Sequence, residues 1–269
     1  TEQQDIWRAG EGAHPVWLDR RREFEPAWKA ALARFSSRQR TLLRLEAECV
    51  KNTSVIIANS KMVREDLLQC YELAGKRVEV IYNGVDFAQF SPDGRSEARA
   101  AVRDRLKLSP ECRLLLFAGS GFRRKGLLEL LRVLKNMDDV VLLVAGRDKP
   151  EPWLRQTSAL GVQDRVIFPG PSKSLPELYR AADVTVLPTW FDSFGFVGLE
   201  SMACGTPLVT TPYAGVSELV PKGINGMVVS RPDAAGELTA AIRSQVSQGD
   251  RSRVIVDSVK EYSLENNIR

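Results

Sequence analysis

The sequence predicts an α/β protein whose larger part is a doubly wound, parallel β-sheet. Two observations support this fold class. From about residue 78 onward, short apolar runs alternate with amphipathic stretches, the pattern of strands that alternate with helices. Glycine or proline follows three of the predicted strands directly, at Gly119, Gly146 and Pro188. Because ligands bind beyond the carboxyl ends of the strands in such sheets, we expect the binding site where these breaks fall.

The alternation of apolar runs with amphipathic stretches predicts the following elements, in chain order. The predicted strands are residues 78–82, 113–118, 140–145, 166–168, 184–188, 208–211 and 227–229. The predicted helices are residues 95–107, 126–137, 151–160, 174–182, 196–204, 215–220 and 233–248.

The first 77 residues have a different pattern. They are predicted to be mainly helical with one clear strand at 55–58, which cannot close a sheet of its own. We therefore interpret them as the end of another domain. The segment 90–96 contains Pro92 and Gly94 and is the best candidate for the linker between the two parts.

Composition and charge exclude several classes of protein. The 269 residues are enough for one large domain or two small ones, and a net charge of +4 argues against a dedicated nucleic-acid binder. Four scattered cysteines without a Cys-x-x-Cys pair argue against zinc and disulfide scaffolds and favour a reducing, cytoplasmic compartment. The apolar runs are only as long as strands, for example 140–145, so no membrane span is expected.

The most informative stretch is 189–207, because it places Asp192 and Glu200 eight residues apart. Asp192 follows a predicted strand, and Glu200 lies on a short helix that Gly195 opens and Gly205 closes. A helix N-terminus offers unpaired N–H groups and a partial positive charge, which suit phosphates, while carboxylates can accept hydrogen bonds from sugar hydroxyls. Hydrolytic acid/base chemistry by the two carboxylates remains an alternative at this stage.

A glycine-rich loop at 119–126 follows a strand and opens a helix. Its glycines permit close backbone approach, and Arg123, Arg124 and Lys125 supply positive charge for an anion. The third glycine is two positions late for the dinucleotide fingerprint, so a nicotinamide enzyme is disfavoured. The alternative is a solvated basic turn. A second helix start suited to anions, at Phe194–Gly195, favours the phosphate site.

Two further features have both a functional and a structural interpretation. His14, the sole histidine, lies in a glycine-rich turn and either faces a substrate or is structural. The segment 20–44 carries eight basic and two acidic residues, hence a net charge of +6, with Trp17, Phe24, Trp28 and Phe35 in and beside it. We expect its arginines to contact anionic lipid head groups and its aromatic residues to pack into the missing part of the N-terminal domain.

With these residues in place, the chain resembles family-4 glycosyltransferases of the GT-B fold, and more narrowly the bacterial lipopolysaccharide core enzymes that add glucose to a heptose. Residues 5–10 are similar to a segment of the acceptor domain, and 81–86 to the crossover motif. Residues 119–126 resemble the diphosphate loop of the narrower group, and 146–150 its next loop. Residues 192–200 match the paired-acid motif, which is the most specific of these.

The resemblance implies transfer of a hexose, glucose in the narrower group, from a UDP-sugar to a lipid-linked glycan acceptor such as a lipopolysaccharide core. Transfer would retain the configuration and use no metal or other cofactor. By position Asp192 and Glu200 are catalytic: Asp192 would contact the donor sugar and Glu200 the ribose hydroxyls. Lys125 with Arg124 would bind the diphosphate, completed by the backbone of 194–197, and His14 would lie on the acceptor side.

The segment from Phe168 to Lys173 would lie against the base. The full donor-binding set implied by the resemblance is Gly119, Ser120, Gly121, Arg124, Lys125, Gly146, Phe168, Lys173, Phe194, Gly195, Phe196, Val197 and Glu200.

The chain departs from the family pattern at several points. The family usually has Glu at the position of Asp192, and the broader family has Arg at the position of Ser120, a change that the narrower group shares. Roughly the first hundred residues of the resembled enzymes have no counterpart, so we expect a fragment. The expected division is the end of an acceptor-side domain at 1–88, a donor domain at 89–253 and the start of a crossover helix at 254–269.

Three functions from different classes are therefore compatible with the sequence. The first is a glycosyltransferase, or its donor half, acting in the cytoplasm or on the inner face of the bacterial cytoplasmic membrane. The second is a non-catalytic module that binds sugar nucleotides. A phosphorylase or epimerase of the same architecture is a weaker third, because nothing in the sequence compels the cofactor lysine or the different catalytic residues that it needs.

Overall fold

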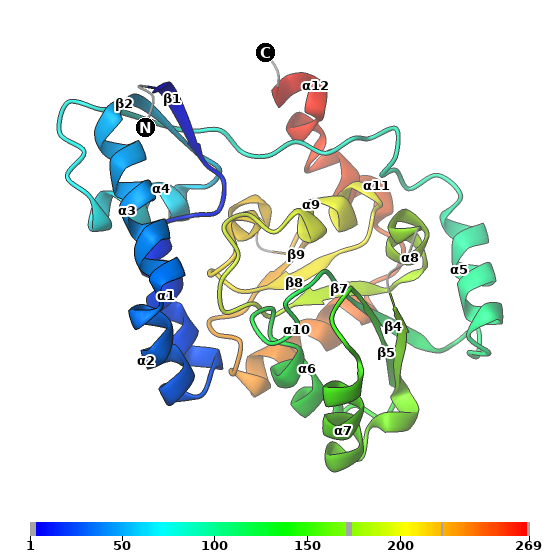
Figure 1. Cartoon of the computed structure of the whole chain (residues 1–269). Coiled ribbons are helices and arrows are strands. Elements are labelled where there is room, and N and C mark those ends of the chain that lie inside the picture. Colours follow the sequence, from blue (N-terminus) through cyan, green and yellow to red (C-terminus); the bar gives the residue numbers. More distant parts are fainter. Residues whose placement is uncertain (1–3, 171–173, 222, 268–269) are drawn as a thin grey trace.

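The computed structural model describes residues 4–170, 174–221 and 223–267. A smaller N-terminal part and a larger C-terminal part lie side by side, and both contain a parallel sheet (Figure 1). The predicted α/β class with a doubly wound, parallel sheet is confirmed.

The larger sheet has six parallel strands in the order β6-β5-β4-β7-β8-β9. Its strands are β4 (Arg113–Ala118), β5 (Val140–Ala145), β6 (Val166–Gly170), β7 (Val184–Leu187), β8 (Leu208–Thr210) and β9 (Gly226–Val228). The central strands β4 and β7 are almost continuously apolar, and their side chains are buried because helices cover both faces of the sheet.

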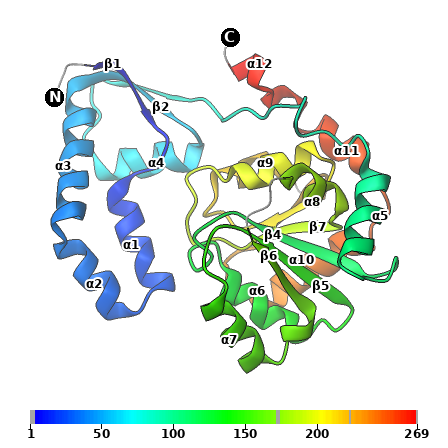
Figure 2. The same cartoon turned by 45° about the vertical axis from the view of Figure 1, so that its right-hand side comes forward.

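The two faces carry separate apolar cores. One core includes Val102, Tyr179 and Leu199, which belong to α5 (Arg95–Arg105), α8 (Leu175–Ala181) and α9 (Phe196–Ala203). The opposite core includes Leu130 and Ile242 and is covered by the helices α6 (Leu127–Leu134), α7 (Glu151–Leu160) and α10 (Ala235–Ser247). This two-sided cover is the doubly wound arrangement (Figure 2).

The N-terminal part corrects one expectation. It forms a three-stranded parallel sheet, β1-β2-β3, where the sequence predicted one strand within the first 77 residues; the strand predicted at 78–82 corresponds to β3. The prediction missed β1 because its residues Asp5 and Ile6 are exposed, so the strand lacks the apolar alternation of a half-buried one. Its elements are β1 (Gln4–Ala9), α1 (His14–Phe24), α2 (Ala27–Phe35), α3 (Ser37–Asn52), β2 (Thr53–Ala58), α4 (Lys61–Cys70) and β3 (Arg77–Val80).

The chain crosses between the two parts twice, and the crossings touch each other. Residues after β3 lead into the larger part, and the C-terminal segment returns as α11 (Ser252–Asp257), a 3₁₀ turn and α12 (Leu264–Asn267). Instead of the continuous crossover helix expected at 254–269, the structure thus has three short helical pieces. Val85 N–H donates to Tyr262 O at 2.9 Å, and Leu264 N–H donates to Val85 O at 3.0 Å.

Candidate active site

A close backbone contact at a glycine places the loop 119–126, which follows β4, against the end of β7. Gly126, the last residue of this loop, has φ of 80°, and a Cβ there would lie 1.9 Å from the carbonyl oxygen of Pro188. Only glycine fits such a contact with backbone. The close approach brings the basic loop next to the segment that follows β7, which carries Asp192.

Lys125 is the buried cation of this loop, with 6% of its surface exposed. Its Nζ lies 2.8 Å from Asp192 Oδ2, and Arg124 NH1 lies 3.6 Å from the same oxygen. Arg124 NH1 also donates to the carbonyl oxygen of Phe191 at 2.5 Å. The basic loop 119–126 and the segment with Asp192, which the sequence analysis selected separately, are therefore in contact.

These cations determine the charge of Asp192. Burial alone would raise the pKa of its carboxyl, but the charges of Lys125 and Arg124 outweigh burial, and the net pKa lies below the ordinary value. Hydrogen bonds from Lys125 and from the backbone of Phe194 act in the same direction. Asp192 is thus an ionised, hydrogen-bonded carboxylate beside two cations.

The helix α9 begins directly after this carboxylate. Gly195 takes φ of 91° at the N-cap position, and the first N–H groups of the helix, at Phe196 and Val197, have no partner within it. The two N–H groups and the helix dipole favour negative charge here. With Lys125 and Arg124 on the neighbouring loop, the site can hold a diphosphate between two elements.

Glu200 lies one turn further along α9 and is held by a residue that the sequence did not indicate. Its Oε2 accepts a hydrogen bond of 2.7 Å from the hydroxyl of Tyr179 on α8. Burial raises the pKa of Glu200, while the bond from Tyr179 and the charge of Lys125 partly offset this effect. Tyr179 is fully buried, and burial together with Glu200 holds the pKa of its hydroxyl well above the ordinary value.

Asp148 is a second residue that sequence reasoning missed. Its carboxylate accepts the backbone N–H of Gly121 at 2.7 Å and that of Phe122 at 2.8 Å. This internal carboxylate fixes the loop and occupies the N–H of Gly121, one of the residues expected to contact the donor. Its position directly after β5, at the carboxyl edge of the sheet, is the signal that could have identified it.

The remaining donor-side residues surround this centre. Gly146 admits no side chain, because a Cβ would lie 2.2 Å from the carbonyl oxygen of Gly119. Ser120 Oγ accepts the N–H of Arg147 at 3.4 Å. Phe168 is half-buried against the α6–α7 core. Lys173 lies outside the described residues, so its expected contact with a base stays a prediction.

A cavity of about 830 Å³ lies between the N-terminal part and this centre. Asp192, Phe191 and Arg124 line one side, while His14 and Arg38 line the other. The cavity is large enough for a small-molecule substrate. It therefore places the Asp192 carboxylate at a surface that a second substrate can reach.

His14 lies at the start of α1 and has structural partners as well as a place in the cavity wall. Its Nε2 is 2.6 Å from Gln39 Oε1, and its backbone N–H donates to the Glu46 carboxylate at 2.9 Å. Glu46 also accepts the hydroxyl of Tyr71 at 2.6 Å. The acceptor-side role of His14 stays a prediction.

The two parts are joined around the cavity by specific contacts. The carboxylate of Glu218 accepts the first N–H groups of α4, from Lys61 at 2.9 Å and Met62 at 2.8 Å. The hydroxyl of Tyr82 donates to the same carboxylate at 2.7 Å. Ser60 Oγ donates to the carbonyl oxygen of Ser193 at 3.0 Å, next to Asp192 in the chain.

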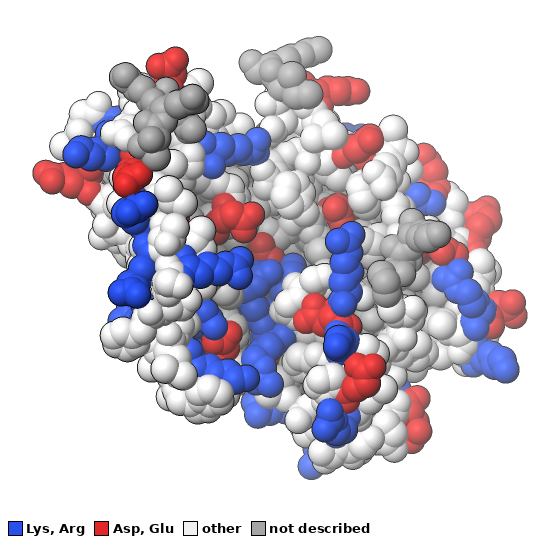
Figure 3. Space-filling model, viewed as in Figure 1, with Lys and Arg blue, Asp and Glu red and all other residues white. Residues whose placement is uncertain are grey.

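Arg20 and Arg21 of the basic segment 20–44 have partners within the protein, and the expected contact of the segment with lipid stays a prediction. Arg20 lies 4.2 Å from the ring centre of Tyr213, and Arg21 pairs with Glu25 at 2.7 Å, so these two arginines are engaged within the protein. Lysine and arginine side chains gather over this part of the molecule and along the cleft beside it (Figure 3).

The aromatic residues of the segment divide into two groups. Trp17 packs against Phe191 at 5.7 Å between ring centres. On α2, Trp28, Leu32 and Phe35 are instead 62%, 61% and 77% exposed. Their spacing puts all three on one face of the helix. Trp17 thus contacts the larger part, and the expected packing of Trp28 and Phe35 against the missing part of the N-terminal domain stays a prediction.

Comparison with known proteins identifies the family. Residues 112–248 match the family model of glycosyl transferases group 1, and residues 13–89 match that of Glycosyltransferase Family 4. The chain belongs to the group 1 glycosyl transferases. The first match covers both the loop with Lys125 and the segment with Asp192 and Glu200.

Curated relatives of this group 1 member include D-inositol 3-phosphate glycosyltransferases. That of Mycobacterium sp. (strain KMS) is 32% identical over 245 residues, which are 87% of this chain and 55% of the relative. That of Salinispora tropica is 34% identical over 206 residues, which are 70% and 43% of the two chains. The chain thus spans about half the length of the curated relatives that it matches.

Solved structures of similar fold confirm the GT-B architecture of this group 1 member. WaaG, a glycosyltransferase involved in lipopolysaccharide biosynthesis, superposes with a TM-score of 0.75 at 21% identity, over 98% of this chain and 71% of WaaG. Sucrose-phosphate synthase from Thermosynechococcus elongatus gives 0.80 at 22% identity, over 97% and 64%. Anabaena HepE in complex with UDP and glucose gives 0.77 at 21% identity, over 97% and 68%.

Two further features were sought in the described part of this chain. No helix there is long and apolar enough to cross a lipid bilayer. The same residues contain no cluster of three histidine, cysteine or acidic side chains arranged to hold a metal ion.

Proposed function

We propose that the chain is the donor-binding part of a retaining glycosyltransferase that moves a hexose, glucose in the first instance, from UDP to a glycan. The observation that supports it best is the Lys125–Asp192 pair at the N-terminus of α9, one helical turn from Glu200. Cations and helix N–H groups then lie beside two carboxylates. Such a set fits a single ligand that has an anionic part and a neutral part rich in hydroxyl groups. UDP with glucose, the ligands named for the HepE structure, has that chemistry.

In this proposal each group acts on a different part of the donor. Lys125, Arg124 and the N–H groups of α9 bind the diphosphate and stabilise the negative charge that develops when the bond to the sugar breaks. Glu200 accepts hydrogen bonds from the ribose hydroxyls, and Tyr179 orients it. Asp192 contacts the donor sugar on the side of the cavity, where the acceptor hydroxyl would attack.

The acceptor would occupy the cavity of about 830 Å³ beside Asp192. We propose a lipid-linked glycan of the lipopolysaccharide-core type, with His14 on the acceptor side. The proposed domain division is 1–88 for the acceptor side and 89–253 for the donor domain, with 254–269 crossing back. The double crossing at Val85 and Tyr262 supports this division.

A lipid-linked acceptor requires work at a membrane, for which we propose the inner face of the cytoplasmic membrane. The exposed face of α2 with Trp28, Leu32 and Phe35 supports this, because apolar and aromatic side chains insert at the head-group level. Exposed basic residues flank that face, among them Lys29 and Arg40. Their charge complements anionic lipid.

The main alternative is a non-catalytic module that binds sugar nucleotides. The observation that favours it is that the family match at 112–248 alone contains Lys125, Asp192 and Glu200, the residues of the proposed donor site. The two functions share the donor site and differ in turnover. A module would bind UDP-glucose without transferring the sugar to any glycan, and a transferase would release UDP in the presence of an acceptor.

Titration calorimetry with UDP, uridine and NAD tests the donor site. Arg124→Gln should weaken UDP about tenfold or more but leave uridine nearly unchanged, because charged hydrogen bonds contribute about 1.5–3 kcal/mol and only UDP has the diphosphate. Arg123→Gln is the matched control, since this neighbour is exposed and donates to the carbonyl oxygen of Phe24 at 3.5 Å. Equal losses for UDP and uridine, or tighter binding of NAD than UDP, contradict the proposal.

A further inference from the structure

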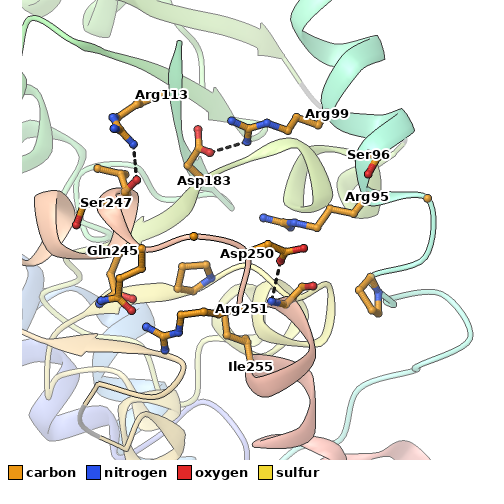
Figure 4. A pocket seen from close by; sticks show the side chains of 18 of the residues that line it. Arg95, Ser96, Arg99, Arg113, Asp183, Gln245, Ser247, Asp250, Arg251 and Ile255 are labelled. Atoms are coloured by element: carbon orange, nitrogen blue, oxygen red, sulfur yellow. Dashed lines mark hydrogen bonds and ion pairs between the residues drawn. The ribbon is translucent and has the colours of Figure 1, made fainter. Parts of the chain in front are cut away.

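A second cavity of about 640 Å³ lies at the opposite edge of the large sheet from the donor site (Figure 4). Arg113 begins β4 there, while Asp183 and Pro207 directly precede β7 and β8. The phosphate loop instead follows the carboxyl end of β4. Six strand residues separate the two edges, which is about 20 Å, so the cavities are distinct.

Arginine side chains enclose this cavity. Arg95 and Arg99 reach it from the start of α5, Arg113 from β4, and Arg251 from the segment before α11 (Figure 4). Arg95, Arg113 and Arg251 form no ion pair within the described parts of the chain. Arg95 donates instead to Thr206 Oγ1 at 2.6 Å and to the carbonyl oxygen of Ala182 at 3.1 Å. The partners of these cations are therefore uncharged.

Among the residues that the structure describes, three acidic ones line the cavity: Asp183 and Asp250 accept hydrogen bonds within the protein, and Glu97 is exposed. Asp183 Oδ1 pairs with Arg99 at 2.5 Å, and its Oδ2 accepts from Arg103 at 3.0 Å and from the N–H of Leu114 at 2.7 Å. Asp250 Oδ1 accepts the N–H of Ser252 at 2.9 Å, at the start of α11. With Arg103, five of the described arginines lie at or beside the cavity against three carboxylates, so a surplus of two positive charges remains there.

Gln245 supplies an independent observation. It lines the cavity, only 3% of its surface is exposed, and its Nε2 has no hydrogen-bond partner in the part of the chain that the structure describes. A buried amide without a partner costs about 1–3 kcal/mol, so buried donors generally have one. Because this Nε2 has almost no accessible surface, a ligand oxygen in the cavity would reach it only after the amide rotates toward the cavity.

We propose that this cavity binds a small phosphate-bearing anion with more than one negative charge, such as a diphosphate. Arg95 forms its buried side, Arg113 and Arg251 its walls, and Gln245 adds a neutral donor. Planar guanidinium groups match the oxygens of phosphate groups, and several of them spaced around one cavity favour a multiply charged ligand over a singly charged one. The site is separate from the proposed donor site and does not depend on it.

Pyrophosphate is the probe, titrated calorimetrically into the full chain with and without saturating UDP. Arg95→Gln removes the buried cation but also three internal contacts, so a second variant is needed. Gly249→Glu adds a carboxylate to the cavity wall where a Cβ meets nothing within 4 Å. Gly236→Glu adds the same charge near the other end of α10, in equally open space, and is the matched control.

We expect pyrophosphate to bind in the presence of UDP, more tightly than orthophosphate. Gly249→Glu should weaken it at least tenfold, and Gly236→Glu should leave it unchanged. Binding that UDP abolishes, equal effects of the two glutamates, or equal affinity for orthophosphate would overturn the proposal. UDP binding measured in the same samples reports on the donor site, so failure of one site is distinguishable from failure of the other.

Discussion

Asp192 and Glu200 show how neighbouring residues, more than sequence spacing, determine the chemistry of a carboxyl group. Asp192 lies beside Lys125 and Arg124, which hold its pKa low in spite of burial. Glu200 has a neutral hydroxyl as its nearest partner, so burial dominates and raises its pKa. Two carboxylates of one motif therefore differ in how readily they take up a proton.

Glu200→Gln is the first prediction at this scale. UDP should bind about tenfold more weakly or worse, because a charge-assisted hydrogen bond contributes about 1.5–3 kcal/mol. The free energy of unfolding at pH 8 should not fall, because a folded-state pKa raised above the unfolded value means that folding disfavours the ionised form at that pH. Calorimetry and urea unfolding measure the two effects, and unchanged UDP affinity rejects the role of Glu200.

The pH dependence of uridine binding is the second prediction. Uridine is the appropriate probe because it carries no phosphate. Binding should weaken as the pH falls through the raised pKa of Glu200, since protonation removes the charged acceptor. Tyr179→Phe removes a hydrogen bond that lowers this pKa, so the loss should begin at a higher pH in that variant. Identical profiles of the wild type and Tyr179→Phe would contradict the coupling.

At the residue scale, the sequence was sufficient to predict those site residues that belong to contiguous motifs. Asp192 and Lys125 were predicted separately, and the structure joins them at 2.8 Å. Tyr179 and Asp148 could not be predicted as partners, because each comes from a distant segment and is placed by the packing of α8 or by the loop after β5. The carboxylate of Asp148 accepts backbone N–H groups of a different loop, and such a long-range contact produces no pattern in the local sequence.

At the element scale, the contact between α6 and the end of β7 depends on one missing side chain. We predict that Gly126→Ala prevents stable folding, because a Cβ 1.9 Å from the Pro188 carbonyl oxygen forces backbone apart. Gly161→Ala is the control: its φ of 71° is also left-handed, but the space around it is open. That variant should lose only about 1–2 kcal/mol, the cost of the conformation alone. Similar unfolding midpoints in urea for the two variants would contradict this argument.

Among the elements, those of the large sheet were the most predictable. Strands such as β4 and β5 are buried on both faces, so their sequences are continuously apolar and easy to recognise. β1 escaped prediction because two of its residues face outward, and its pairing with β2 is a long-range contact that no local pattern encodes. The segment after α10 was predicted as one helix, but it breaks where it meets Val85.

At the scale of the whole molecule, we predict that membrane binding depends on α2 more than on the arginines of α1. Trp28→Ser with Phe35→Ser should reduce co-sedimentation with anionic vesicles, because both side chains are exposed. Arg20→Gln with Arg21→Gln should have a smaller effect, since these side chains contact Tyr213 and Glu25. UDP affinity should be unchanged in the α2 variant.

Salt provides the control for this measurement. The electrostatic share of binding should decline as the Debye length shortens from about 10 Å at 0.1 M, whereas the share contributed by Trp28 and Phe35 should persist. A wild-type chain that stays in the supernatant at low salt would contradict a membrane role, and the exposed face of α2 would then need another explanation.

The paired crossings at Val85 and Ser263 have a mechanical consequence. Two connections that lie side by side resist torsion better than one, so the easiest rigid-body motion is a bend about the line through them. α2 lies at the far end from these crossings in both views, with α1 beside it (Figures 1 and 2), so these two helices have the longest lever arm. A slight bend would separate Trp17 from Phe191 and widen the cavity beside Asp192. The loop 119–126 lies wholly within the larger part and would keep its shape.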